Sequence, residues 1–425
     1  MAKSTKAKKK ATKGKKKGKI RIAKPRAPKR RPVKPTTVKV AEPRTGNNEP
    51  ALDIARSQTR IGSNVFTLDV ARRMPKNGNY FVSPFNIRTA LAMLYAGARK
   101  GTAGEMAKVL GFPEEQKFLH LQLSNLKEKL EATGILKMAN SVWVDDGQPV
   151  ELLFQKVMEE MYKAKMGIVN FEGNPEGCRA AINRWVEEAT SDKIKNLMGD
   201  GSVTIDTKMV LVAAIHFKDM WKTAFSPDDT QEEDFFSPGG TVKTPFMSRV
   251  ANFGYAKGPG YYKILEMPYK SGLSMFIILP HGHGDLPVIE KDLLSGKIEL
   301  PRELAKPEVR VTFPKFKVEY GFPAADMLKQ MGMPLAFSDD ADFSGISKGK
   351  DALKVDSVIH KAFCEVNEEG TEAAAATAVV MMKCTSFTPE PEPEIFRADH
   401  PFLYMIRENV EGNILFIGRM ENPKG

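Results

Sequence analysis

Apolar residues recur every three to four positions through much of the first half of the chain, with polar residues between them. This period predicts amphipathic helices, each with one face toward a core. One segment begins with Ser83 and Pro84, a typical N-cap and first helical residue, and Gly97 stands near its end. The pattern predicts helices at residues 60–74, 83–101, 102–112, 117–133, 151–164 and 178–197.

Strand patterns dominate the second half. The continuous apolar run "MVLVAAI" from Met209 is typical of a strand buried on both faces. Two short apolar runs, 263–269 and 274–280, are separated only by "KSGL" and predict a hairpin. Helices followed mainly by strands favour an α+β fold. Further strands are predicted at 308–320, 358–367, 402–408 and 414–420.

Charge divides the chain into two parts. The whole sequence of 425 residues has a net charge of +12, yet residues 1–50 alone hold 19 Lys/Arg and 2 acidic residues. The remainder holds 45 basic and 50 acidic residues and is mildly acidic. The basic part has too few apolar residues to bury a core or to form a signal peptide. We therefore expect a disordered basic tail at 1–52 and one folded domain at 53–425.

The cysteines indicate an intracellular protein. Cys178, Cys364 and Cys384 are few, odd in number and far apart, which is not a disulfide framework. No Asn-x-Ser/Thr acceptor occurs in the sequence. No apolar run approaches the roughly 20 residues that span a bilayer, so no membrane partner is expected.

The sequence contains no recognisable catalytic constellation. There is no G-x-S-x-G elbow and no Gly-rich phosphate loop. His281 and His283 in "HGHG" have no acidic or Cys residue beside them in the sequence. We expect no catalytic residue, no metal and no cofactor, and therefore a protein that is not an enzyme.

Residues 365–394, "EVNEEGTEAAAATAVVMMKCTSFTPEPEPE", combine conflicting preferences. Four consecutive alanines favour a helix, whereas Thr and Val favour a strand. The Pro-Glu repeat from Pro389 favours an exposed extended chain. One explanation is that the segment adopts more than one conformation.

Seven segments occur in a fixed order along the chain: "NYFVSPFNIRTALAMLYAGARKGTAGEM", "INRWVEEATSDKIKNL", "LEMPYKSGLSMFIILP", "VTFPKFKVEY", "ADFSGIS", "VIHKAFCEVNEEGTEAAAATA" and "FRADHPFLYMIRENVEGNILFIGRM". Together they resemble the serpin family, over roughly residues 60–425. The resemblance implies three β-sheets, eight to nine helices and an exposed reactive loop at about 368–394.

The serpin mechanism implies that a protease cuts this loop and becomes attached to it as an acyl-enzyme. Residues 370–383 then insert into the central sheet as a new strand. Inward positions of such a strand must be small or β-branched, as they are here. Non-inhibitory relatives usually carry a bulky, charged or proline residue in the hinge, whereas here the inward positions carry none and Glu372 alternates outward. The hinge residues are Glu368, Glu369, Gly370, Thr371, Glu372, Ala373, Ala374, Ala375, Ala376 and Thr377.

Two positions for the cleaved bond remain open. Counting from Gly370 without a gap, as in common inhibitory serpins, implies Cys384–Thr385, and a count one residue shorter gives Lys383–Cys384. Lys383 before the bond suits a trypsin-like protease or a cysteine protease that accepts Lys. Cys384 before it suits a different specificity.

The resemblance also implies a polar shutter beneath the sheet and an aromatic residue at its top, the breach. Asn79, Ser83 and His360 match shutter positions, and Trp221 matches the breach, where it is expected to pack. Asn86 and Ala213 depart from the family pattern. Ala213 removes a side-chain partner expected for His360.

The tail predicts a polyanion partner. Clustered lysines bind polyanions by counterion release, and "PKRRPVK" is typical of a nuclear localisation signal. We expect a nuclear protein that binds an import receptor and DNA or chromatin non-specifically; the alternatives are a solubilising tail, an acidic-polysaccharide ligand or a cytoplasmic location. A second hypothesis is a non-inhibitory serpin that acts as a chromatin architectural protein. The polyanion-binding candidates are Lys8, Lys9, Lys10, Lys15, Lys16, Lys17, Lys29, Arg30 and Arg31.

Overall fold

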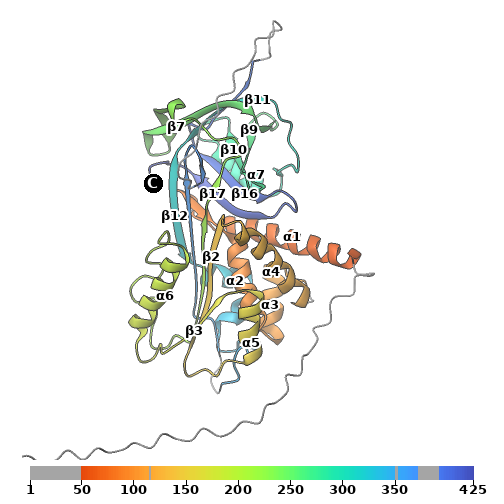
Figure 1. Cartoon of the computed structure of the whole chain (residues 1–425), viewed down its shortest axis with the longest axis vertical. Helices are drawn as coiled ribbons and strands as arrows, with labels where there is room; N and C mark the ends of the chain where they lie inside the picture. The colour runs from red at the N-terminus through yellow and green to blue at the C-terminus, as the bar shows by residue number, and fades with distance from the viewer. Residues whose placement is uncertain (1–48, 114–115, 350–352, 372–391) are drawn as a thin grey trace, which may run out of the picture. The chain divides into compact units, whose positions relative to one another are not determined.

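A computed structural model describes residues 49–113, 116–349, 353–371 and 392–425. It confirms the α+β class and the predicted number of helices within these ranges (Figure 1). A π-helical turn, Val157–Met161, follows the fifth helix directly. No helix in the described ranges is both long enough and apolar enough to cross a bilayer. The helices are α1 (Glu49–Ala71), α2 (Pro84–Tyr95), α3 (Lys100–Leu110), α4 (Gln116–Ala132), α5 (Leu152–Lys156), α6 (Pro175–Ala189), α7 (Leu286–Leu294) and α8 (Ala325–Met331).

The strands form the three expected sheets. The first has the order β1 (Tyr80–Val82), β17 (Ile414–Met420), β16 (Phe402–Glu408), β10 (Leu273–Pro280), β9 (Tyr262–Pro268) and β8 (Gly254–Lys257). The second has the order β15 (Glu394–Arg397), β11 (Glu308–Pro314), β7 (Gly240–Asn252) and β6 (Thr230–Ser237). The third, the main sheet, contains β3 (Lys165–Val169), β2 (Leu136–Asp145), β4 (Met209–Phe217), β13 (Ser357–Val366), β14 (Gly370–Thr371) and β5 (Asp219–Met220), with β12 (Phe316–Pro323) paired to β13.

Helices cover both faces of the main sheet. Figure 1 shows α6 on one side and α2, α3 and α4 on the other. Every residue of β4 is buried, and its side chains alternate between two cores. Leu211, Ala213 and Ile215 join the larger core, whereas Val210 and Val212 join a second core beneath α6. The continuous apolar run therefore reflects burial on both faces, as predicted.

Some predicted boundaries differ from the structure. The segment 308–320 splits at Lys315 into β11 and β12, which belong to different sheets. The predicted helix 178–197 ends at Ala189, although Ile194 and Leu197 remain buried beyond it. The first helix begins at Glu49, so the folded part extends slightly into the segment expected to be tail.

Candidate hinge and sheet-opening site

A tight turn reverses the chain at the end of β13. The N–H of Asn367 donates to the Gly370 carbonyl at 2.9 Å, and the Gly370 N–H donates back at 3.3 Å. The Asn367 side-chain oxygen accepts from the N–H groups of Glu369 and Gly370 at 3.0 and 3.2 Å. Asn side chains favour such turns for this reason. The reversed chain becomes β14, antiparallel to β13.

Gly370 and Thr371, the two predicted hinge residues that form β14, lie between β13 and β5. Gly370 pairs with Met220, and Thr371 pairs with Asp219 on one side and with Val366 on the other. Gly370 has a φ of +155°, and a Cβ placed there would lie 2.1 Å from the Asp219 carbonyl oxygen. Backbone-to-backbone contact at this distance requires glycine.

Thr371 is held in place by a tyrosine. It is fully buried, and its Oγ1 lies 2.8 Å from the hydroxyl oxygen of Tyr269. Burial raises the pKa of Tyr269 well above its ordinary value, so the phenol stays neutral. The Tyr269 ring also stacks on Trp221, with centroids 4.4 Å apart. Nothing in the sequence pattern singled out Tyr269.

Trp221 donates hydrogen bonds to the hinge turn, in addition to the packing that was predicted for it. Its indole Nε1–H donates to the Asn367 carbonyl at 3.0 Å, and its backbone N–H donates to the Glu369 carbonyl at 2.8 Å. The N–H of Phe225 donates to the Glu368 carbonyl at 2.8 Å. The segment after β5 therefore holds the hinge turn by three hydrogen bonds.

The Glu368 side chain anchors the turn from the other side. Lys315 lies 2.8 Å from one carboxylate oxygen, and the Thr230 hydroxyl donates to the other at 2.9 Å. Burial acts to raise the pKa of Glu368, but the hydrogen bonds from Lys315 and Thr230 outweigh it and hold that pKa below its ordinary value. Glu368 is thus a charged anchor, which the sequence pattern did not reveal.

His360 bridges β13, β4 and the start of α2. Its Nε2 accepts the Ser83 N–H at 3.1 Å, so the proton resides on Nδ1, which donates to the Ala213 carbonyl at 2.7 Å. Burial lowers the pKa of His360 to about 4, which keeps the ring neutral. The Ser83 hydroxyl donates to the Leu415 carbonyl at 2.7 Å.

The structure brings only part of the predicted shutter together. Asn79 does not join His360: its amide donates to the Asn422 carbonyl and its oxygen accepts from the Glu421 N–H. It therefore fastens the C-terminal segment. The side chain missing at Ala213 is replaced by that residue's backbone carbonyl, so His360 keeps both of its hydrogen bonds.

Two buried amides accompany the shutter. The side chains of Asn86 in α2 and Asn140 in β2 have no hydrogen-bond partner among the described residues. Asn140 is the register partner of Ala213, which in turn pairs with His360 across the sheet. Asn140 was missed by the sequence reasoning because a lone Asn within a strand has no distinctive spacing.

The hinge lies at the end of a parallel strand pair. Residues 357–363 of β13 pair with residues 210–216 of β4 in parallel. A chain continuing from β14 back along β13 would run antiparallel to both strands. The other flank of the loop enters β15 of the second sheet at Glu394. Both candidate bonds (Lys383–Cys384 and Cys384–Thr385), hinge residues 372–377 and all predicted tail lysines and arginines lie outside the described residues.

His283 of the "HGHG" segment lies close to two possible metal ligands, Asp399 and His400, from a distant part of the sequence. His283, Asp399 and His400 have potential metal-ligand atoms within 4.8 Å of one another. However, the His400 ring nitrogens already bond Asp399 at 2.8 Å and the Pro280 carbonyl at 2.9 Å, and Asp399 also accepts from Arg397. These bonds occupy the atoms that a cation would need.

Comparisons with known proteins agree with this geometry. A model of the serpin (serine protease inhibitor) family matches residues 62–423. An uncharacterized serpin-like protein of Thermococcus kodakarensis is 41% identical over 355 residues, covering 82% of each chain. Leukocyte elastase inhibitor of Bos taurus is 39% identical over 360 residues, covering 81% of this chain and 93% of the relative.

A solved structure shares the fold. Serpin48, a highly specific serpin of the insect Tenebrio molitor, superposes with a TM-score of 0.77 at 31% identity. The match covers 89% of this chain and 99% of the insect chain. Such relatives support protease inhibition in general. The family match, the identities and the shared three-sheet fold show that this chain belongs to the serpin family.

Proposed function

We propose that the protein is a suicide inhibitor of serine proteases, or of cysteine proteases that accept the same loop. The observation that carries the proposal is the position of Gly370 and Thr371. They already lie between β13 and β5, at the end of the β4–β13 pair, with β14 directed back along β13. Cleavage of the loop beyond them would release residues 370–383 to continue this strand.

The strand directions in the main sheet favour insertion of residues 370–383 between β4 and β13. It would exchange the parallel β4–β13 pairs for antiparallel pairs on both sides of the new strand, and antiparallel pairing is slightly more stable per residue. An inserted strand of about 15 residues spans roughly 50 Å. An acyl-linked protease carried that far would be distorted before it deacylates.

The target class depends on which bond is cut. Cleavage at Lys383–Cys384 fits a trypsin-like protease or a cysteine protease that accepts Lys, and cleavage at Cys384–Thr385 fits a different specificity. Incubation with a panel of proteases, followed by gel analysis for SDS-stable complexes and mass mapping of the cut, distinguishes the two.

Thr371→Arg tests the mechanism. Thr371 is fully buried, so an arginine there would carry its charge into the sheet. We expect loss of the SDS-stable complex, with the loop cleaved as an ordinary substrate. Glu372→Arg is the matched control, because the period of a strand directs residue 372 outward. Normal inhibition by Thr371→Arg would overturn the insertion account.

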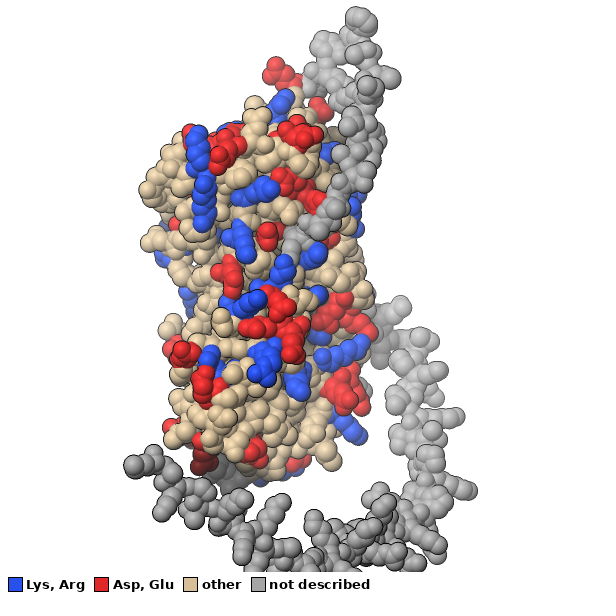
Figure 2. Space-filling view, turned by 60° about the vertical axis from the view of Figure 1, so that its left-hand side comes forward, with Lys and Arg blue, Asp and Glu red and all other residues tan. Residues whose placement is uncertain are grey.

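We further propose that the basic tail directs nuclear import and binds DNA or chromatin non-specifically. The support is charge: residues 1–50 hold 19 Lys/Arg and 2 acidic residues. On the face of the folded part in Figure 2, basic and acidic residues are interspersed. Deletion of residues 1–45 should abolish nuclear accumulation and reduce DNA affinity at physiological salt. Unchanged accumulation contradicts the import role, and unchanged affinity contradicts the binding role.

An acidic polysaccharide is the alternative ligand of the tail, and competition between heparin and DNA measures that preference. A non-inhibitory chromatin protein is the alternative function of the whole chain. It predicts that no protease in the panel yields an SDS-stable complex while DNA binding persists.

A further inference from the structure

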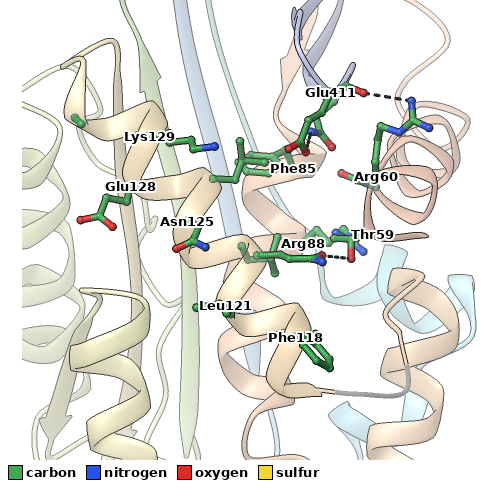
Figure 3. Close-up of a pocket in the computed structure, with 16 residues that line it drawn as sticks. Thr59, Arg60, Phe85, Arg88, Phe118, Leu121, Asn125, Glu128, Lys129 and Glu411 are labelled. Carbon is green, nitrogen blue, oxygen red and sulfur yellow. Dashed lines mark hydrogen bonds between the residues drawn. The ribbon is translucent and has the colours of Figure 1, made fainter. Parts of the chain in front are cut away.

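A pocket of about 350 Å³ lies between α1, α2, α4 and the turn that joins β16 to β17. In Figure 3, Leu121, Asn125 and Lys129 come from α4, and Phe85 and Arg88 from α2, with Thr59 and Arg60 on α1 to the right. Pockets for small organic molecules in proteins have volumes of about 300–1,000 Å³. The space is therefore of ligand size, and it is separate from the hinge.

A buried cation forms part of the pocket wall. The Arg88 side chain is 1% exposed. Its Nε donates to the Leu110 carbonyl at 2.6 Å and its Nη2 to the Gly111 carbonyl at 3.0 Å. Its third nitrogen, Nη1, is buried without a hydrogen-bond partner among the described residues. A buried guanidinium normally satisfies all its donors.

No acidic side chain in the described part of the protein compensates this charge. The guanidinium lies over the Phe112 ring, 4.7 Å from its centroid, and no described carboxylate forms an ion pair with it. Burial lowers the pKa of Arg88 to about 9, so the group remains largely charged at neutral pH. An uncompensated buried charge is strongly unfavourable, and an anion in the pocket would supply the missing partner.

Two further donors line the same pocket. Ser63 Oγ, on a residue that is 2% exposed, has no partner among the described residues, and neither does the half-buried Gln122 Nε2. The Thr59 hydroxyl donates to Gln122 Oε1 at 2.6 Å, which leaves Nε2 as the unpartnered end of the amide. Three residues from three helices thus line one pocket, each has a buried donor without a partner among the described residues, and one of them is charged.

The rest of the wall is partly apolar and partly charged. Phe85, Phe118, Leu123 and Leu126 line the pocket, together with Leu121, which is 44% exposed. The polar part of the remaining lining consists of Arg60, Asn125, Glu128, Lys129, Glu411 and Asn413. The apolar part favours a hydrocarbon body over a hydrated inorganic ion. A polar end and an apolar body together describe an amphipathic anion.

We propose that this pocket binds a small amphipathic monoanion, such as a medium-chain carboxylate, with its charged group against Arg88, Ser63 and Gln122 and its hydrocarbon part against the aromatic and leucine side chains. The site does not depend on cleavage of the reactive loop, and it stands whether or not the protein inhibits a protease.

The test is calorimetric titration of the full-length protein with decanoate, kept below its micelle concentration, and with decanol as the uncharged counterpart. We expect one decanoate per chain and at least about tenfold weaker binding of decanol, since a hydrogen bond to a charged group contributes about 1.5–3 kcal/mol. Equal binding of the two probes, binding of neither, or several decanoates per chain would overturn the proposal.

Variants locate the binding in the pocket. Arg88→Met should weaken decanoate binding at least about tenfold, by the same reasoning. Arg184→Met on α6 removes one exposed arginine outside the pocket and should bind as the unaltered protein does. Decanoate affinity unchanged in Arg88→Met, or lowered equally in both variants, would contradict the assignment.

Arg88 also caps two carbonyls, so its replacement can disturb the fold. Gln122→Glu and Ser63→Ala avoid this, because Glu keeps the oxygen that accepts from Thr59 and removes only the unpartnered Nε2, and Ser63 Oγ has no partner among the described residues. Each should keep the thermal midpoint of the ligand-free protein within a few degrees and weaken decanoate binding severalfold. Full affinity in both variants would exclude the proposed donors.

Discussion

The Tyr269 hydroxyl and Thr371 Oγ1 lie 2.8 Å apart in a buried site, and this hydrogen bond holds Thr371, at the start of the proposed reactive loop, within the main sheet. Tyr269 lies directly after β9 of the first sheet, whereas Thr371 belongs to β14 of the main sheet. The bond therefore ties the hinge to a part of the protein that does not belong to the main sheet.

Tyr269→Phe should destabilise the intact protein. The change leaves Thr371 Oγ1 buried without its partner, and an unsatisfied buried hydroxyl costs about 1–3 kcal/mol. Urea denaturation measures the change in the free energy of unfolding. Tyr320→Phe is the control, since the Tyr320 hydroxyl makes no hydrogen bond among the described residues and its loss should be nearly neutral. Equal effects of the two variants would show that the hinge contact is unimportant.

Gly370→Ala should displace the hinge. Its Cβ would lie 2.1 Å from the Asp219 carbonyl oxygen and 2.6 Å from Met220 Cα, and both are backbone atoms that cannot turn away. We expect a loss of about 1–3 kcal/mol in unfolding free energy and faster proteolysis near the hinge. Gly239→Ala is the control, because nothing lies within 4 Å of a Cβ there. Retained stability in Gly370→Ala would contradict the hinge geometry.

Stability should fall in mild acid because of His360. Burial lowers its folded-state pKa to about 4, whereas the unfolded chain titrates near 6.5. The unfolded state therefore binds more protons between these values, so the contribution is complete above pH 6.5 and is lost as the pH falls toward 4. The predicted loss between pH 7 and pH 4.5 is about 2–3 kcal/mol.

His360→Gln should flatten this dependence, because the amide can donate to Ala213 and accept from Ser83 without titrating. Denaturation at pH 7 and pH 4.5 measures the difference between the two proteins. His120, whose pKa burial also lowers to about 4, remains in both and supplies the same background. An unchanged pH dependence in His360→Gln would show that His360 is not held neutral.

Long periodic segments were predictable from sequence, and tertiary details were not. The buried run at Met209 and the hairpin of β9 and β10 are local patterns, and both appear in the structure. At Lys315 the alternation of apolar residues shifts from positions 309, 311 and 313 to positions 316, 318 and 320, which marks a break, but no local pattern shows that β11 and β12 join different sheets. The helical pattern past Ala189 persists because Ile194 and Leu197 still face the core from an irregular chain that includes positive φ at Ser191 and Asp192.

The candidate site divides in the same way. Gly370, Thr371, Ser83, His360 and Trp221 were identified from motifs. In the structure Gly370 and Thr371 pair with β5, Ser83 bonds His360, and Trp221 bonds Asn367, whereas their roles as hinge, shutter and breach stay predictions. Asn79 was assigned to the shutter but bonds the C-terminal segment. The partners Tyr269 and Lys315 come from segments 102 and 53 residues away from Thr371 and Glu368, a proximity that only the folded chain reveals.

The most direct measurement is the thermal midpoint of the protein before and after a single cut between residues 383 and 385. If the segment from Thr371 onward joins β4 and β13 as a new strand, the nicked protein should melt well above the intact one, because it gains pairing on both sides of that strand. Identical midpoints would mean that no strand was added, and the proposed trapping of a protease would then have no physical basis.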